Sequence, residues 1–340
     1  MTRQVNVGLV GVGRIGRLHA EHLAYRIPQA RLLAVSDVVV EAAQKAAADL
    51  GVPIATRDHR AIMDNQDIEA VVICSSTDTH SLMIEEAAAA GKHIFCEKPI
   101  DFDLARIDRA LAAVDEAGVK LQIGFNRRFD PNFRRVRELV ASGKLGQPHI
   151  LRITSRDPQP PPIAYVKVSG GIFLDMTIHD FVMARYLIGS EGEEIYVAAG
   201  VMVDPEIGKA GDVDTAVITL RFENGAIGTI DNSRRAVYGY DQRVEVFGSG
   251  GAVSVDNNYP NAAVVSDGQR IQRDLPFNFF IERYVESYIV EVKEFIECVV
   301  KDTPPPVTGI DGRIPVVMGY AAGKSYAEHR PVRLSEIAPV

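Results

Sequence analysis

Residues 170–180, GGIFLDMTIHD, place two titratable side chains, Asp175 and His179, four positions apart in an otherwise apolar stretch. In a helix, residues at this spacing share one face, with Cβ atoms about 5–6 Å apart. A histidine, whose ordinary pKa is about 6.5, is suited to accept a hydroxyl proton near neutral pH, and an aspartate beside it can orient the ring. We therefore predict that Asp175 and His179 are catalytic, the alternative being a histidine that is satisfied within the core.

A lysine follows the apolar run HIFC, which predicts a buried strand over residues 93–96. In a parallel sheet, the residue just past the carboxyl end of a strand faces the crevice where such sheets bind ligands, and Pro99 fixes the chain there. We predict that Lys98 is a third catalytic residue, which stabilises the charge on an alcohol oxygen as its proton leaves. The alternative is a solvated lysine at a strand end.

Three glycines, Gly11, Gly13 and Gly16, form the pattern G-x-G-x-x-G between a strand expected over residues 5–10 and a helical pattern. This context is typical of dinucleotide binding. The first glycine allows a tight turn, the second lets the backbone approach a pyrophosphate, and the third lets the helix pack close to the sheet. The same helix carries His19, which we interpret as a helix-start residue and not as a catalytic one.

Asp37 indicates which dinucleotide binds, because it ends the second expected strand. Its carboxylate can accept hydrogen bonds from the adenosine ribose and would repel a 2′-phosphate, and three valines follow it instead of an arginine. We therefore expect NAD in preference to NADP. The residues predicted to contact the cofactor are Gly11, Gly13, Arg14, Ile15, Gly16, Asp37, Val38, Ser75, Ser76, Thr77, His80, Glu97 and Lys98.

Further polar side chains are candidates for holding a polar substrate. Arg127 follows the fifth expected strand, whereas Asp157 and Tyr240 belong to the second expected domain. We predict that these three residues line the substrate pocket. Arg128 is the alternative to Arg127, and Tyr238 is the alternative to Tyr240.

The composition excludes several classes of partner. The 340 residues include 37 basic and 45 acidic side chains, a formal net charge of -8 at pH 7, so we expect no binding to nucleic acid or anionic lipid. No apolar run approaches the roughly 18 residues that span a bilayer, and the first residues lack a signal-peptide pattern, so we expect a cytoplasmic protein. The 3 cysteines have no zinc-site or close-pair spacing, so we expect neither a metal site nor a disulfide.

The elements that position these residues show two patterns. In the first third, short apolar segments alternate with helical patterns, which predicts a parallel, doubly wound sheet of the Rossmann type. The expected strands there cover residues 5–10, 31–37, 70–74, 93–96 and 120–125.

Beyond Phe125, segments with alternating apolar and polar residues predict a domain of α+β type on an open, mainly antiparallel sheet. The expected strands cover residues 149–157, 195–203, 214–222, 225–233 and 242–248. One long amphipathic helix is expected over residues 280–300. We therefore predict an α/β NAD-binding domain over residues 1–125 and a substrate-binding and oligomerisation domain over residues 126–340.

Four segments of the chain resemble a known family. The start GVGRIGRLH, the run IFCEKPI, the segment IGFNRRFDPNF and the segment GGIFLDMTIHDFVMARYL are similar to the Gfo/Idh/MocA oxidoreductases. Within that family, the last segment, with SRDPQPPP and NSRRAVYGYDQRVEVFG, is most similar to inositol 2-dehydrogenases. The resemblance runs over nearly the whole chain.

This resemblance implies an active site between a Rossmann domain and an open-sheet domain, with a triad formed by Lys98, Asp175 and His179. It implies oxidation of a ring hydroxyl of a polyol, first of all myo-inositol, to a ketone with transfer of hydride to NAD. Many members are homotetramers built through the exposed sheet.

One position departs from the pattern of inositol dehydrogenases, which often carry an acidic residue where this chain has Val182. The departure leaves a different cyclic polyol or a pyranose sugar open as the substrate. A second enzyme hypothesis is therefore an NAD(P)-dependent sugar dehydrogenase, or a sugar oxidoreductase that keeps its nucleotide bound between turnovers. A third is a non-catalytic NAD-binding regulator, which the presence of Lys98, Asp175 and His179 disfavours.

Overall fold

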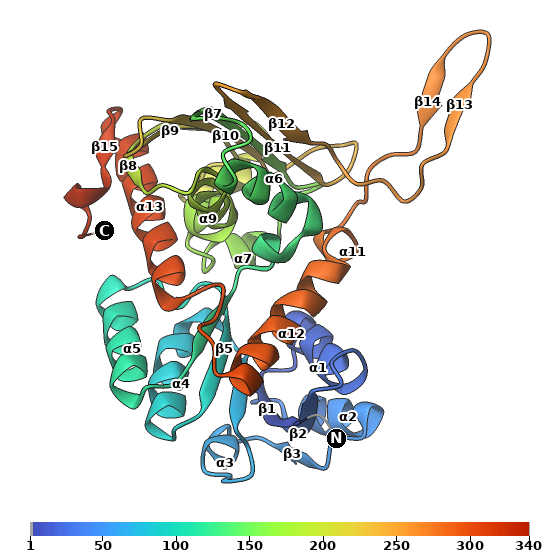
Figure 1. Ribbon diagram of the computed structural model, residues 1–340, viewed down its shortest axis with the longest axis vertical. Helices are drawn as coiled ribbons and strands as arrows, with labels where there is room; N and C mark the ends of the chain where they lie inside the picture. The colour runs from blue at the N-terminus through green and yellow to red at the C-terminus, as the bar shows by residue number, and fades with distance from the viewer. Residues whose placement is uncertain (1–2, 340) are drawn as a thin grey trace. The chain divides into compact units, whose positions relative to one another are not determined.

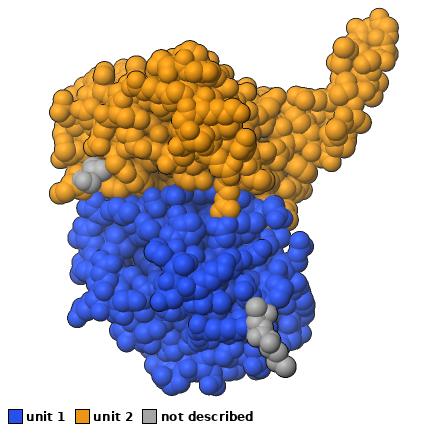
Figure 2. All heavy atoms as spheres, viewed as in Figure 1, with its two compact units in different colours: residues 1–129, 286–313 blue, residues 130–285, 314–340 orange. Residues whose placement is uncertain are grey.

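The computed structural model describes residues 3–339, which form two compact units. Unit 1 comprises residues 1–129 and 286–313, and unit 2 comprises residues 130–285 and 314–340 (Figure 2). None of the helices in the described range is both long enough and apolar enough to cross a membrane.

Unit 1 is built on a parallel six-stranded sheet with the order β3-β2-β1-β4-β5-β6. Its strands are β1 (Val5–Val10), β2 (Ala30–Ser36), β3 (Ile54–Thr56), β4 (Ala70–Ile73), β5 (His93–Glu97) and β6 (Leu121–Gly124). The doubly wound sheet predicted from the sequence is confirmed. The additional strand, β3, was not predicted because its three residues are too few and too exposed to show a pattern.

Helices alternate with these strands along the chain. Those lying wholly within the first segment of unit 1 are α1 (Arg14–Tyr25), α2 (Val40–Leu50), α3 (Arg60–Met63), α4 (Thr77–Ala89), α5 (Leu104–Ala117) and the 3-10 helix η1 (Asn126–Phe129). Helix α12 (Val285–Lys301) supplies most of the second segment, and α13 (Gly309–Glu328) begins in unit 1 and ends in unit 2.

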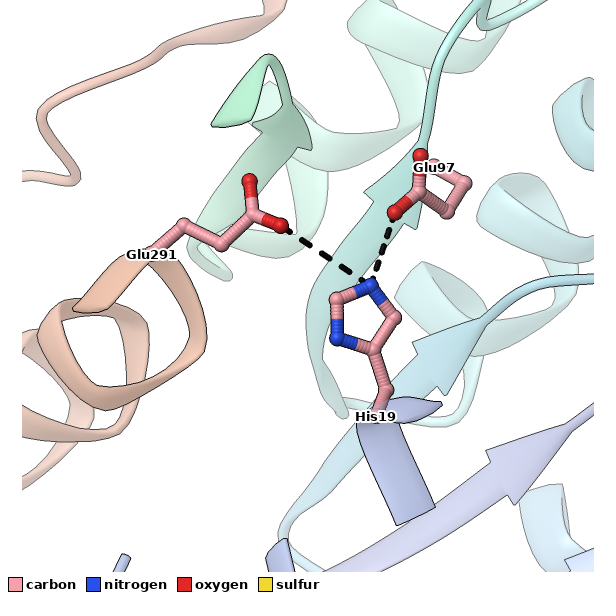
Figure 3. Close-up of side chains that lie close together, drawn as sticks. All are labelled: His19, Glu97 and Glu291. Atoms are coloured by element: carbon pink, nitrogen blue, oxygen red, sulfur yellow. Dashed lines mark hydrogen bonds and ion pairs between the residues drawn. The ribbon is translucent and has the colours of Figure 1, made fainter. Parts of the chain in front are cut away.

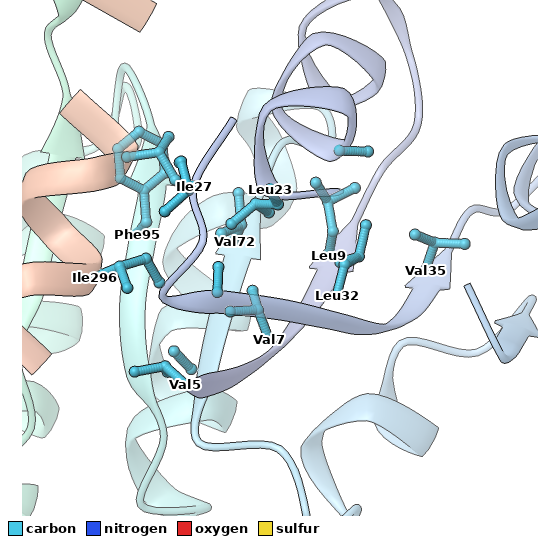
Figure 4. Packing of buried hydrophobic residues seen from close by; sticks show 14 of the residues in the cluster. Val5, Val7, Leu9, Leu23, Ile27, Leu32, Val35, Val72, Phe95 and Ile296 are labelled. Carbon is cyan, nitrogen blue, oxygen red and sulfur yellow. The ribbon is translucent and has the colours of Figure 1, made fainter. Parts of the chain in front are cut away.

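The core of unit 1 explains why residues 286–313 belong to it (Figure 4). Valines and leucines of β1 and β2 pack with Phe95 of β5, and Val292, Phe295 and Ile296 of α12 join the same cluster. The rings of Phe95 and Phe295 have centroids 5.9 Å apart. The apolar face of a helix from late in the chain therefore completes the core of the first sheet.

Unit 2 is built on a mixed, mostly antiparallel sheet with the order β12-β11-β7-β10-β9-β8-β15. The strands of unit 2 are β7 (Pro148–Arg156), β8 (Gly192–Gly200), β9 (Thr215–Phe222), β10 (Ile227–Ser233), β11 (Asp241–Gly248), β12 (Gly251–Val255), β13 (Val264–Ser266), β14 (Ile271–Arg273) and β15 (Val332–Arg333). The predicted mainly antiparallel sheet is confirmed, with one parallel pair, β7 and β10, that the sequence did not indicate. Strands β13 and β14 form a separate hairpin that projects from the sheet (Figure 1).

The two faces of this sheet differ. Along β9, buried residues alternate with exposed ones, so one face packs against helices and the other is open. Helix α9 contacts β7 and β10 on the covered face, and α6 lies against α9 (Figure 1). Apart from the part of α13 that belongs to unit 2, the remaining helical elements of the unit are short. The helices of unit 2 are α6 (Pro131–Ala141), α7 (Ile163–Val166), α8 (Gly171–Asp175), α9 (Thr177–Ile188), α10 (Pro205–Lys209), α11 (Phe280–Arg283) and the 3-10 helix η2 (Leu334–Glu336).

One expected helix and one expected domain boundary can be compared with the structure. The single long helix expected over residues 280–300 is wrong, because the chain leaves helical geometry at Tyr284, with φ −116° and ψ 20°, and α12 starts afresh at the next residue. The division into domains at residues 125 and 126 stays a prediction. The compact units change near that point, but they also assign residues 286–313 to unit 1.

Candidate active site

The glycine turn that follows β1 has the shape that a pyrophosphate requires. Gly11 has φ +87°, and a Cβ there would lie 2.6 Å from the carbonyl oxygen of Cys74. A Cβ on Gly16 would lie 1.8 Å from the carbonyl oxygen of Gly11, so only glycine lets α1 approach the turn. Nothing lies within 4 Å of a Cβ built on Gly13, the N-cap of α1. The helix N-terminus is thus open to an anion, and the turn fits NAD.

Asp37 lies beside this turn. Its Oδ2 accepts a hydrogen bond of 2.9 Å from the backbone N–H of Val12, and its Oδ1 accepts one of 2.9 Å from that of Val39. The carboxylate is therefore fixed next to the glycine turn, where the ribose of a bound dinucleotide is expected. Val38, the next residue in the sequence and also predicted to contact the cofactor, is exposed.

Residues after β4 form the adjoining part of the same sheet edge. Ser75 and Thr77 are half-buried, and Ser76 is the N-cap of α4. His80 is buried, with Nδ1 2.8 Å from the carbonyl oxygen of Pro99 and Nε2 3.0 Å from that of Ser75. Its ring thus bridges the turns after β4 and β5.

Lys98 and Arg127 follow β5 and β6 at the same carboxyl edge of the parallel sheet. Lys98 is half-buried, and the peptide bond between it and Pro99 is cis. Arg127 is buried, whereas Arg128 forms an ion pair of 3.0 Å with Asp311 and donates to the carbonyl oxygen of Pro306. Unit 1 therefore gathers the glycine turn, Asp37, the serine turn, Lys98 and Arg127 along one edge of its sheet. Ligand crevices of doubly wound folds form at this edge.

In unit 2, the segment that carries Asp175 and His179 is helical but interrupted. Asp175 ends α8, His179 lies in the first turn of α9, and Met176 between the two helices has φ −93° and ψ −59°. Thr177, the first residue of α9, donates its hydroxyl to Asn232 of β10 at 2.6 Å. The geometry of an unbroken helix therefore does not apply across Met176. Asp175 and His179 are both half-buried.

Two side chains that we did not single out from the sequence hold Asp175. The hydroxyl of Tyr165 donates to Asp175 Oδ1 at 2.8 Å, and Arg234 Nη1 donates to Asp175 Oδ2 at 3.3 Å. Burial and then the Asp175 carboxylate raise the pKa of Tyr165, so the phenol stays protonated as a donor although the residue is 47% exposed. The Arg234 side chain is 1% exposed, and its Nη2 lies 3.7 Å from Asp212.

Neighbouring candidates in unit 2 have different surroundings. Asp180 is fully buried and accepts a hydrogen bond of 2.9 Å from Asn232, so it serves the interior of the unit. Val182 is 1% exposed and packs in the core. Tyr238 donates to Asp241 at 2.6 Å.

The two substrate residues predicted in unit 2 lie at the ends of its strands. Asp157 follows β7 and is half-buried. Tyr240 precedes β11, and its ring centroid lies 6.0 Å from that of Tyr284. Their contact with a substrate stays a prediction, as does every other site assignment made from the sequence.

The two groups of side chains have complementary chemical capacities. Unit 1 offers a glycine turn open to an anion, the aspartate beside it and a lysine. Unit 2 offers an imidazole base and a carboxylate held by an arginine and a tyrosine. Hydride transfer from an alcohol needs a bound nucleotide and a group that removes the hydroxyl proton, and side chains suited to these two tasks are present.

Comparisons with known proteins cover both units. Residues 5–125 match the family model described as oxidoreductase family, NAD-binding Rossmann fold, and residues 133–254 match the GFO/IDH/MocA C-terminal domain. The chain is 51% identical to the myo-inositol 2-dehydrogenase of Thermotoga maritima over 98% of this chain and 99% of that protein. It is 45% identical to the inositol 2-dehydrogenase of Rhizobium meliloti over 97% and 99%.

A solved structure extends the similarity to three dimensions. The myo-inositol dehydrogenase of Lactobacillus casei, crystallised in complex with NAD(H) and myo-inositol, is similar with a TM-score of 0.87 and 27% identity over 97% of this chain and 96% of that one. Both family models and this solved structure agree with the fold described above. The chain therefore belongs to the Gfo/Idh/MocA family of NAD-binding oxidoreductases.

Proposed function

We propose that this protein is an NAD-dependent inositol 2-dehydrogenase, which oxidises one ring hydroxyl of myo-inositol to a ketone. The observation that carries the proposal is the 51% identity over 98% of the chain to a myo-inositol 2-dehydrogenase. That similarity extends over 333 residues and therefore covers parts of both units.

In this proposal, three side chains act on one substrate hydroxyl. NAD, when bound, supplies the acceptor for the hydride that leaves the carbinol carbon. His179 takes the hydroxyl proton, so that the C=O bond forms as the C–H bond breaks. Lys98 stabilises the negative charge that develops on the same oxygen, and Asp175 orients the imidazole or holds a neighbouring hydroxyl.

The remaining predicted residues would set substrate orientation. Arg127, Asp157 and Tyr240 are proposed to hydrogen-bond ring hydroxyls, because a polyol needs a donor or acceptor for each desolvated oxygen. Val182 contributes packing in the core of unit 2, so we propose that specificity depends on other residues.

A substrate panel tests this function. The purified protein is incubated with NAD and myo-inositol, scyllo-inositol or a pyranose sugar, and initial rates are read from NADH absorbance. We expect the highest kcat/KM with myo-inositol and little activity in Lys98→Met. Higher activity with a pyranose would favour the sugar dehydrogenase. Nucleotide that survives gel filtration and cycles between two substrates would favour the bound-nucleotide oxidoreductase.

We also propose that the protein is a cytoplasmic homotetramer. The open face of the unit 2 sheet exposes large apolar side chains, which is unusual for a surface that stays in water. They are Tyr196, Val217, Ile227 and Phe247. Light scattering during gel filtration is expected to give four times the chain mass of 37.1 kDa. A monomer mass at micromolar concentration would contradict this assembly.

A further inference from the structure

The titratable side chains of His19, Glu97 and Glu291 meet inside unit 1. Glu97 directly precedes the predicted catalytic lysine in the sequence. His19 Nε2 lies 2.7 Å from Glu97 Oε1 and 3.8 Å from Glu291 Oε1. Figure 3 shows the imidazole on α1 directed at both carboxyl groups, with Glu97 at the end of β5 and Glu291 on α12. His19 and Glu291 are both 0% exposed. Such a cluster has to be nearly neutral, because unpaired charge is costly in an interior.

Glu291 supplies part of that neutrality. Within the described residues, neither of its carboxyl oxygens has a hydrogen-bond partner. Burial, and then the neighbouring Glu97, raise the pKa of Glu291 well above its ordinary value. The interior thus favours the uncharged form of Glu291, and His19 lies within hydrogen-bond distance of Glu97 but not of Glu291.

Glu97 joins the histidine to the main chain of the lysine. Its Oε1 accepts from His19, and its Oε2 accepts a hydrogen bond of 3.3 Å from the backbone N–H of Lys98. The neighbouring strand leaves room for this carboxylate, since a Cβ on Gly124 would lie 3.1 Å from it. A larger residue at that position would force Glu97 to move.

The imidazole itself has little freedom. Its ring centroid lies 5.3 Å from that of Phe95 and 5.9 Å from that of Tyr288, both in edge-on arrangements. Aromatic neighbours in this geometry restrict the ring and shield its hydrogen bond from water. Glu97 is thus held in one place by a rigid donor.

We propose that His19 and Glu97 are positioning residues that act through Lys98. Their hydrogen bond ties the carboxyl end of β5, where Lys98 leaves the sheet, to helix α1, which begins at the glycine turn for NAD. The lysine and the cofactor site are thereby held in one fixed relation. This inference rests on the catalytic role of Lys98 in the proposed function.

A divalent cation is the competing occupant, because the donor atoms of His19, Glu97 and Glu291 all lie within 4.8 Å of one another. Two observations favour the hydrogen bond. The distance of 2.7 Å between His19 and Glu97 is already that of a charge-assisted hydrogen bond. His19 Nδ1 has no partner in the described part of the chain, whereas a metal-bound histidine almost always donates its other N–H to a second group.

The test compares two substitutions of the histidine. His19→Ala removes the donor and is expected to lower kcat roughly 10- to 100-fold, the loss expected for one hydrogen bond to a charged group. The KM for NAD is expected to stay within about threefold, because the glycine turn is unchanged. His19→Gln places an amide N–H near the position of Nε2 and is expected to restore most of kcat. His22→Gln, on the same helix and also buried, is the matched control and should affect stability only.

A double-mutant cycle with Lys98→Met identifies the route of the effect. If His19 acts through the lysine, His19→Ala adds little to the loss already caused by Lys98→Met. Additive losses would overturn the inference while leaving the proposed function intact. A wild-type rate in Lys98→Met would instead defeat the catalytic role of the lysine, and the inference with it.

Two further measurements keep the test decisive. If His19→Ala does not fold, Glu97→Gln replaces it in the same cycle, with an expected fall in kcat of about tenfold. Metal analysis of the purified protein is expected to find no stoichiometric transition metal. One bound equivalent that is lost in His19→Gln, together with the activity, would overturn the positioning role in favour of a metal site.

Discussion

Replacing Arg234 by methionine removes the guanidinium that holds Asp175 and fills the buried space with a side chain of similar length. Arg234 Nη1 lies 3.3 Å from Asp175 Oδ2. A hydrogen bond to a charged group contributes about 1.5–3 kcal/mol, and about 1.4 kcal/mol corresponds to a factor of ten in rate. If the contribution acts on the reacting geometry, kcat falls about 10- to 100-fold. We expect the lower end of this range because Tyr165 still donates to Asp175.

The assay measures NADH formation with myo-inositol and thermal unfolding on the same samples. Asp212 also loses its cationic neighbour, so we expect the free energy of unfolding to fall by about 1–3 kcal/mol. Arg235→Met removes the same charge from the next, exposed residue and is expected to keep the wild-type rate. A variant Arg234→Met that melts earlier yet turns over at the wild-type rate would refute the reasoning, since the arginine would then serve folding alone.

Three other outcomes follow from the same structure. Asp37→Ser should shift the NAD/NADP ratio of kcat/KM toward NADP by roughly 10- to 100-fold, because the carboxylate repels the 2′-phosphate of NADP. Unit charges about 5 Å apart repel by about 1–3 kcal/mol at effective dielectric constants of about 80 to 20. An unchanged ratio would place Asp37 away from the ribose. His179→Ala should lose roughly 10²–10⁴-fold in rate, and the loss should be smaller at high pH, where hydroxide replaces the base. The losses caused by His179→Ala and Asp175→Asn should be less than additive in the double variant. Strict additivity would show that the two residues act independently. Burial, and then His19, lower the pKa of His22 to about 4, below the ordinary value of about 6.5. The unfolded chain therefore binds the proton first, and the free energy of unfolding falls by up to about 3 kcal/mol as pH drops from 6.5 to 4. In His22→Gln the denaturant midpoint should vary less with pH over this interval, and an equally steep fall would assign the effect to other groups.

Local sequence was sufficient for features that depend on neighbouring residues. The glycine turn could be predicted because its requirements lie within a few residues of each other. Gly11 adopts a positive φ, and Gly16 packs closely against the backbone of Gly11. Long apolar or alternating runs predicted most strands to within a few residues. Strands β3, β12, β13, β14 and β15 escaped, since each is short and shows no run of buried residues, and their pairing depends on a neighbouring strand.

The interruption at Met176 shows where periodicity stops being informative. The run from 171 to 188 is mostly apolar and has a helical pattern, and nothing in its spacing marks a break. The break coincides with the hydrogen bond from Thr177 of α9 to Asn232 of strand β10. A side chain distant in the sequence thus accompanies a change in geometry between Asp175 and His179.

The sequence by itself determined the residue types of this protein's chemistry and the elements that carry them: an anion-binding turn, a lysine after a parallel strand, and an aspartate and a histidine four positions apart. Only the tertiary structure decided which partners hold them. Arg234 reaches Asp175 across 59 positions, and His19 reaches Glu97 across 78. Helix α12 brings Glu291 back to the first sheet from near the end of the chain. Such contacts leave no local pattern, because they arise when burial of apolar faces packs distant segments together, and burial then determines how strongly each charged pair interacts.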